Sequence, residues 1–367
     1  MPPKVFKKSI ITMTSIHFPS GQRVLYQALS KQVNQHFKSQ QLAKTGNQQL
    51  YRKALTISLL FMASFALIFA LPGYLNWIAW IAHGVATALV GFNIMHDGAH
   101  ESFSRSRRIN RLAALSFNLI GSNRFYWAQK HNRNHHTFTN VDELDEDIDA
   151  FGLFRMSPRQ TRYFFHRWQH VYAWFLYPLT SLFWFFALDY KAYFSQKIAT
   201  RPFSHKMALS DHLEFWCSKL LYIGLYLLLP ASVFGWSNTL TGFLLMHAVL
   251  GFLFAVVFQL AHVVDQAEFP APQQGGEHDG EMADEWAVHQ LRTTVDFATN
   301  NRWVTWALGG LNFQVEHHLF PRISHIHYPM LHQLLCSTEL SHPVRSYRTV
   351  REALAGHYRH LRNLGQA

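Results

Sequence analysis

Two long stretches of the chain, 54–96 and 220–264, contain no charged side chain and are rich in apolar ones. A helix needs about 20 apolar residues to cross the hydrocarbon core of a bilayer, so each stretch is long enough for two passes. Each is interrupted near its middle, by LPGYLNW at 71–77 and by GWSNTLTG at 235–242. The pattern predicts an all-α integral membrane protein with two helical hairpins, whose four spans lie at about 54–71, 75–95, 219–236 and 240–262.

The run VYAWFLYPLTSLFWFFAL at 171–188 has the length of a further span but a different composition. Pro178 divides it, and it is crowded with aromatic residues, which favour the membrane–water interface. A fifth span would also place the histidine clusters of the chain on opposite faces of the membrane. We therefore expect an interfacial segment here.

Basic residues predict the orientation of the chain. Residues 1–53 hold nine Lys and Arg and no acid, whereas both hairpin turns are uncharged. The positive-inside rule then places the N-terminus, the segment 96–218 and the C-terminal third on the cytoplasmic side. We expect a basic segment 1–53, a membrane domain with its cap at 54–330, and a helical tail at 331–367.

The formal net charge of +11 indicates which kinds of molecule the protein is expected to bind. A basic cytoplasmic face suits anionic lipid or an anionic substrate. Nucleic-acid binding is the other interpretation of such a charge, but the membrane spans argue against it.

The histidines fall in clusters at the expected cytoplasmic ends of the spans. HDGAH places His96 and His100 four residues apart, on one helix face. HNRNHH repeats that spacing and adds a third ring on the neighbouring face. His262 ends the last span, and QVEHH follows a Gly-Gly pair that allows close backbone approach or a helix start. The eight clustered histidines are His96, His100, His131, His135, His136, His262, His317 and His318.

Eight imidazoles without thiolates suit Fe, Zn, Cu or Ni by ligand type. Zinc normally takes four ligands, so the count favours two metal ions. A ligating histidine usually donates its other N–H to a carboxylate or a carbonyl. The candidates for this supporting role are Asp97, Glu101, Glu316 and the acidic run at 142–149.

Other histidines have simpler interpretations. His83 and His247 lie in mid-span and are expected to pack or to hydrogen-bond between helices. His166 and His170 lie near the expected cap and are weak ligand candidates that would instead line a channel.

With these residues in place, the sequence resembles the integral-membrane fatty acid desaturases. Their three histidine boxes stand here as HDGAH, HNRNHH and QVEHH, in the right order and separated by a membrane hairpin. The resemblance covers about residues 50–330. The sequence GGLNFQVEHHLFP is most similar to the acyl-CoA and front-end branch of this family, in which Gln replaces the first histidine of the third box.

The resemblance implies a cytoplasmic helical cap over two iron ions, with His262 as the ligand outside the boxes. It implies O2 as co-substrate, a fatty acyl-CoA or acyl-lipid substrate, and desaturation. No HPGG haem motif is present, so electrons are expected from a separate cytochrome b5, ferredoxin or similar donor. Gln314 is a weaker ligand than imidazole, and we place it among the supporting residues.

Two alternatives remain open from the sequence. A di-iron membrane hydroxylase or monooxygenase shares the histidine clusters and differs only in inserting oxygen. A histidine-rich metal transporter would need polar residues at the bilayer midplane. The spans carry almost none apart from His83 and His247.

Overall fold

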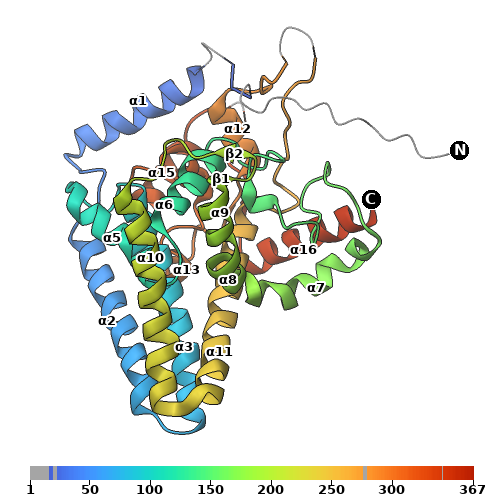
Figure 1. Ribbon diagram of the computed structural model, residues 1–367. Helices are drawn as coiled ribbons and strands as arrows, with labels where there is room; N and C mark the ends of the chain where they lie inside the picture. Colours follow the sequence, from blue (N-terminus) through green and yellow to red (C-terminus); the bar gives the residue numbers. More distant parts are fainter. Residues whose placement is uncertain (1–15, 20–22, 276–278, 341) are drawn as a thin grey trace, which may run out of the picture.

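The computed structural model describes residues 16–19, 23–275, 279–340 and 342–367. Within them the regular secondary structure is helical apart from two short strand pairs and one isolated β-bridge, which confirms the all-α prediction. Long helices form a bundle at one end, and short helices and loops form a cap at the other (Figure 1).

The first hairpin is formed by α2 (Gln48–Ala70) and α3 (Tyr74–Val90). α2 begins before the expected residue 54 because the Asn47 side chain accepts hydrogen bonds from the first-turn amides of Gln49 and Leu50. The predicted break at 71–77 is confirmed, and Gly73 takes a positive φ of 57° there. Beyond α3 the helical stretch continues without a break through the π-helix η1 (Gly91–Met95) and α4 (His96–Ala99).

The second hairpin is formed by α10 (Leu209–Ile223), the π-helix η7 (Gly224–Leu228) and α11 (Leu229–His262). The predicted break at 235–242 is confirmed as a very short reversal at Gly235, where φ is 75° and ψ is 164°. The Trp77 indole N–H donates to the Asn238 side chain at 2.7 Å and so joins the two turns. Both hairpins therefore turn at the same end of the bundle, opposite the cap.

Four helical stretches are long and apolar enough to cross a membrane: Gln48–Ala70, Tyr74–Ala99, Phe164–Ser195 and Leu209–His262. The last has 54 residues and is the one that reverses at Gly235. The chain is an integral membrane protein.

Close approach and buried hydrogen bonds hold the hairpins together. A side chain at Gly84 would meet the backbone of Met246, so this glycine lets α3 lie against α11. His83 bonds Ser64 at 2.8 Å and Tyr226 at 2.9 Å. His247 makes the equivalent pair of bonds, to Ser181 and Tyr222, both at 2.9 Å. The prediction that these two histidines serve helix packing is confirmed.

The stretch Phe164–Ser195 bends at Pro178. The limb before it lies across the direction of α2 and α3, beside the C-terminal helix, and the limb after it runs up into the cap (Figure 1). Its elements are η4 (Phe164–Trp168), α7 (Gln169–Leu176), η5 (Tyr177–Leu179), α8 (Thr180–Phe183), η6 (Trp184–Leu188) and α9 (Asp189–Ser195). Its interfacial location stays a prediction.

The cap consists of short elements that close over the upper ends of the bundle. Its helices are α1 (Val24–Ser39), α5 (Arg107–Leu119), α6 (Arg124–Trp127), η2 (Ala128–His135), η3 (Glu146–Ile148), α12 (Trp286–Thr293), α13 (Arg302–Ala307), α14 (Gln314–Leu319), η8 (His325–His327), α15 (Tyr328–Cys336) and α16 (Val350–Gln366). Its strands are β1 (Lys197–Ile198) antiparallel to β2 (Arg201–Pro202), and β3 (Asp296–Phe297) parallel to β4 (Ser346–Tyr347).

The first and last helices of the described chain, α1 and α16, both pack against other elements. α1 contacts α12 and α15, and α16 contacts α7, η4 and α11. The domain limits expected at residues 53 and 330 stay predictions. Residue 330 itself lies inside α15.

Candidate metal centre

Four separate segments bring the eight clustered histidines together where the bundle meets the cap. They come from α4 and its C-cap, from η2 and its C-cap, from the last residue of α11, and from α14. Each of the eight is at most 6% exposed. Ring centroids lie 4.4 Å apart for His96 and His317, and 4.8 Å apart for His262 and His318. The eight residues thus lie together at one end of the bundle, as the two hairpins predict.

The second histidine cluster lies on a π-helix, not on the α-helix that its spacing predicts. In η2 the His136 amide donates to the His131 carbonyl, five residues back, at 3.0 Å. The wider turn brings the Nε2 atoms of these two rings to 3.1 Å from each other. His136 therefore shares a face with His131 instead of pointing to the neighbouring face. Single π-turns are frequent at functional sites, and a second one, η1, directly precedes His96.

A tight turn at two glycines places the QVEHH cluster beside the HDGAH cluster. Gly309 and Gly310 have φ values of 60° and 72°, which favour glycine. A side chain at Gly309 would collide with the Phe92 carbonyl of η1, so the turn lies directly on the segment that leads to His96. The expected close backbone approach is confirmed, and it places α14 beside α4.

The ligand atoms form two adjoining groups. One nitrogen from each of His96, His100, His131 and His317 lies within 4.8 Å of the others. His135, His262 and His318 form a second group by the same measure. His136 groups with His317 and His318 and so lies between the two.

Several of the buried nitrogens have no hydrogen-bond partner among the described residues. They are both ring nitrogens of His96, the Nδ1 atom of His136, and the Nε2 atoms of His100, His317 and His318. Buried polar atoms are nearly always paired, so this group of unpaired nitrogens favours a bound ligand. Burial also holds the pKa values of His131, His136, His317 and His318 well below the usual range. Neutral imidazoles with free lone pairs are what a metal ion requires, so the residues fit such an ion.

The comparisons with known proteins agree with this arrangement. The family model described as fatty acid desaturase matches residues 72–349. The chain is 34% identical to the sn-1 linoleoyl-lipid 6-desaturase of Synechocystis, over 98% of this chain and 100% of that protein. The chain belongs to the fatty acid desaturase family. The resemblance carried by the three histidine boxes is thereby confirmed.

Two further relatives extend the comparison. The sn-1 linoleoyl-lipid 6-desaturase of Arthrospira platensis is 33% identical over 92% of this chain and 91% of its own length. The acyl-lipid (8-3)-desaturase of Physcomitrium patens is 34% identical over 93% of this chain and 71% of its own length. Members of this family with such names are oxidoreductases that act on lipids, and the desaturase described here is an enzyme of that family.

Four groups outside the cluster orient the histidines of this desaturase. The ring N–H of His135 points to Asp145 at 3.0 Å, within the acidic run proposed for this role. The sequence reasoning missed the other three, which come from distant segments that carry no local signal. His317 bonds the Tyr328 hydroxyl at 3.0 Å. His318 bonds the Gln290 side-chain oxygen at 2.8 Å, and His262 lies 3.4 Å from the Thr293 carbonyl.

The other predicted supporting residues have different partners in the desaturase. Asp97 contacts Ser324 at 2.7 Å and His325 at 3.0 Å, so it ties α4 to the segment before α15. The Glu101 side chain is 58% exposed and its ion-pair partner is Arg322. Within the described residues, neither carboxylate forms a hydrogen bond with one of the eight clustered histidines, so a supporting role for Asp97 and Glu101 stays a prediction.

Glu316, Gln314 and His170 also lie apart from the ring nitrogens of the cluster. Glu316 bonds His332 at 2.9 Å, on the side of α14 that faces β3. Gln314 is buried and donates to the Leu311 carbonyl at 2.9 Å. His170 packs on Tyr358 at the outer edge of the cap, with ring centroids 5.0 Å apart, and joins none of the histidine groups.

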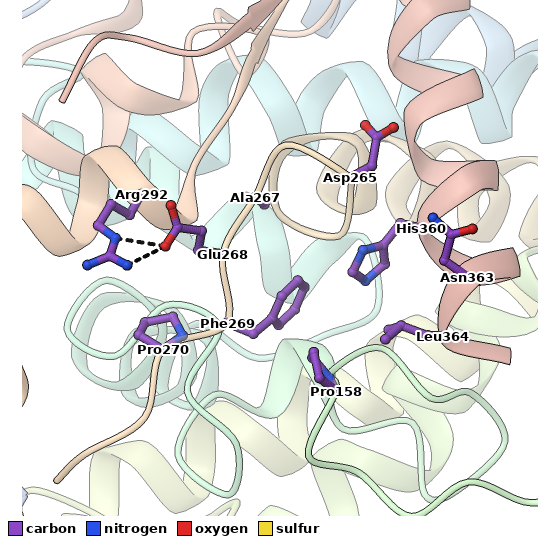
Figure 2. A pocket seen from close by; sticks show the side chains of 10 residues that line it. All are labelled: Pro158, Asp265, Ala267, Glu268, Phe269, Pro270, Arg292, His360, Asn363 and Leu364. Atoms are coloured by element: carbon purple, nitrogen blue, oxygen red, sulfur yellow. Dashed lines mark hydrogen bonds and ion pairs between the residues drawn. The ribbon is translucent and has the colours of Figure 1, made fainter. Parts of the chain in front are cut away.

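A cavity of about 410 Å³ lies elsewhere on the cap, between the loop after α11 and α16 (Figure 2). Its charged groups already have partners. Glu268 pairs with Arg292 and Arg345, and Asp265 pairs with Arg359. None of the eight clustered histidines lines it. This cavity therefore belongs to the packing of the cap on α16 and not to the metal centre.

Proposed function

We propose that this protein is an acyl-lipid desaturase that holds two iron ions between its eight clustered histidines. The single observation that carries the proposal is the convergence of eight buried histidines from four segments, with several ring nitrogens left unpaired. An imidazole cluster of this size exceeds what one ion takes, and its two adjoining groups suit two ions.

The ligand sets follow from the two groups of nitrogens. His96, His100, His131 and His317 would hold one ion, and His135, His262 and His318 would hold the other. His136 lies between the groups and would complete the second set. Asp145, Tyr328, Gln290 and the Thr293 carbonyl would hold the rings in the orientations that ligation needs.

The reaction removes one hydrogen from each of two adjacent methylene carbons of an acyl chain. O2 receives two electrons from the substrate and two from a donor, and leaves as two waters. Iron supplies the oxidising power that an unactivated C–H bond demands and that side chains lack. The protein contributes position: burial keeps the clustered histidines other than His135 neutral and excludes water, and the protein holds the acyl chain beside the cluster.

The membrane arrangement supports an active site on the cytoplasmic face. We propose four crossings, two in each hairpin, with Phe164–Ser195 remaining at the interface. The two turns joined by Trp77 and Asn238 would lie on the far side. The basic N-terminal residues and the cap would then share the cytoplasmic side, as the positive-inside rule requires.

The names of the relatives support a lipid-linked substrate. Three of them are described as acting on acyl groups of lipids, so we propose a glycerolipid in preference to acyl-CoA. Electrons would come from a separate cytochrome b5 or ferredoxin, which would dock on the cytoplasmic cap.

Expression in a host that supplies linoleoyl lipids tests this proposal. Gas chromatography with mass spectrometry should show a fatty acid with one more double bond, dependent on O2. His100→Ala, His135→Ala and His318→Ala should each abolish that product, and bound iron should fall below two ions per chain. The matched control is His205→Ala, since His205 is exposed and distant in the chain from the boxes.

Two outcomes would contradict the proposal. A hydroxylated product in place of a new double bond would identify a hydroxylase. Product formation that persists in all three histidine variants would show that the cluster is not the catalytic metal site.

A further inference from the structure

The limb before Pro178 presents an apolar stripe away from the protein. The stripe consists of residues at helical spacing on η4, α7 and η5: Phe164, Trp168, Val171, Phe175 and Leu179. Phe164 is 77% exposed and Phe175 is 75% exposed, although both are large and aromatic. A contiguous apolar face of this kind in a membrane protein marks a surface that meets lipid.

The depth of this stripe follows from its contact with α11. Pro178, beside the last residue of the stripe, lies against Gly251, where any side chain would collide with its carbonyl. Gly251 precedes His262 by eleven residues, or about 16 Å of helix, and lies inside the uncharged stretch 220–264. One end of the stripe therefore reaches the apolar layer, while α7 lies across the direction of α2 and α3 (Figure 1).

A basic basin lies at the other end of the stripe. It has a volume of about 560 Å³ and is lined by side chains of η4, α7, α16 and the residues just before η4, including Arg162, Arg167, Arg362 and Tyr358. Arg167 stacks on Trp168 of the stripe, 3.8 Å from the ring centroid. Arg162 donates to the Gly365 carbonyl at 2.9 Å, which anchors it to α16. Three cations thus surround one open space.

These cations are not neutralised within the protein. None of the three arginines forms an ion pair with a carboxylate in the part of the chain that the structure describes. In the same cap, Arg124, Arg292, Arg345 and Arg359 all have carboxylate partners. Guanidinium groups around a cavity bind phosphate well, because their N–H groups match its oxygens.

We propose that this basin binds the phosphate of an anionic bilayer phospholipid, while the stripe beside it inserts among the acyl chains. In such a site the apolar residues contact the acyl chains, and the arginines bind the phosphate at the level of the head groups. The proposal depends on the protein being embedded in a membrane and not on the reaction that it catalyses.

Native mass spectrometry of the full chain in detergent tests the proposal. The probes are phosphatidylglycerol, phosphatidylcholine and inorganic phosphate. Arg167→Gln/Arg362→Gln should weaken phosphatidylglycerol binding by about 10–30-fold, since each basic residue near anionic lipid contributes roughly a fivefold factor. Neither side chain forms a hydrogen bond with another described residue, so folding should persist.

Two controls accompany this variant. Lys31→Gln/Lys38→Gln removes the same charge from α1, on the far side of the cap, and should bind as the wild type does. Arg167→Lys/Arg362→Lys keeps the charge and should retain most of the binding.

Three results would overturn the proposal. Equal losses in the Arg167→Gln/Arg362→Gln variant and in the Lys31→Gln/Lys38→Gln variant would show that only net charge matters. Equal binding of phosphatidylcholine and phosphatidylglycerol would show that the basin does not prefer an anionic lipid. Displacement of the lipid by millimolar inorganic phosphate would reduce the basin to a site for a small anion.

Discussion

Asp145→Asn is expected to loosen the metal centre without unfolding the cap. Asp145 is buried, and its Oδ2 accepts hydrogen bonds from the His135 ring at 3.0 Å and the Asn140 amide at 2.9 Å. Its Oδ1 accepts from the Asp147 amide at 3.0 Å. Asparagine has the same shape but only one acceptor oxygen and no charge. At least one of these contacts must therefore be lost, whichever way the amide turns.

The expected magnitude follows from what the carboxylate does to His135. Burial alone would lower the pKa of this ring, but the bond and charge of Asp145 outweigh it and raise the pKa. A more basic imidazole is a better ligand, and loss of such a supporting group typically costs about 10–100-fold in metal affinity or activity. We expect Asp145→Asn to lose iron within that range during dialysis against a chelator, measured by plasma mass spectrometry, with a parallel loss of product.

Asp142→Asn is the matched control for this experiment. It makes the same change of charge on the same loop, but the Asp142 carboxylate contacts Ser157 and not a histidine of the cluster. This control should keep wild-type iron and product. If both variants lost iron equally, or if neither did, the argument that Asp145 holds His135 in its ligating orientation would fail.

Two further predictions concern stability. His332 contacts both Asp296 and Glu316; burial opposes its charge, but these carboxylates raise its pKa to about 11. The resulting stability is fully present below the unfolded pKa of about 6.5 and is lost as pH rises through about 11. The variant His332→Gln should therefore show a smaller fall in melting temperature at alkaline pH. It should also lower the free energy of unfolding by about 3 kcal/mol at neutral pH. Tyr226→Phe removes the hydroxyl that bonds His83 and should cost about 0.6 kcal/mol by thermal denaturation in detergent, with iron content unchanged.

The hairpins could be predicted because their signal is local. A run of apolar residues, interrupted by Pro72 and Gly73 in one case and by Gly235 in the other, specifies two helices and a reversal without reference to the rest of the chain. Once the spans were placed, His96 and His262 had to emerge at the same face. The convergence of the histidine clusters therefore followed from membrane geometry and did not need the details of the cap.

The groups that orient the rings could not be predicted, because they depend on distant contacts. Gln290 and Tyr328 reach His318 and His317 only after α12 and α15 have packed around α14. Adjacency suggested Asp97 and Glu101 instead, and both have other partners. The π-turn of η2 was missed for a related reason: an extra residue in a turn is stabilised by its surroundings, and the spacing HNRNHH is compatible with either helix.

Two sets of buried histidines differ in whether the protein itself provides hydrogen-bond partners for their ring nitrogens. His83 and His247 are as deeply buried as the clustered rings, yet both nitrogens of each bond a neighbouring hydroxyl group. His96 has both nitrogens unpaired, and His317 and His318 each use one nitrogen for an orienting bond and leave the other free. Burial cannot distinguish these two classes, and composition cannot either. Because an unpaired buried nitrogen costs free energy, a cluster of such nitrogens favours a bound ligand, whereas His83 and His247 need none.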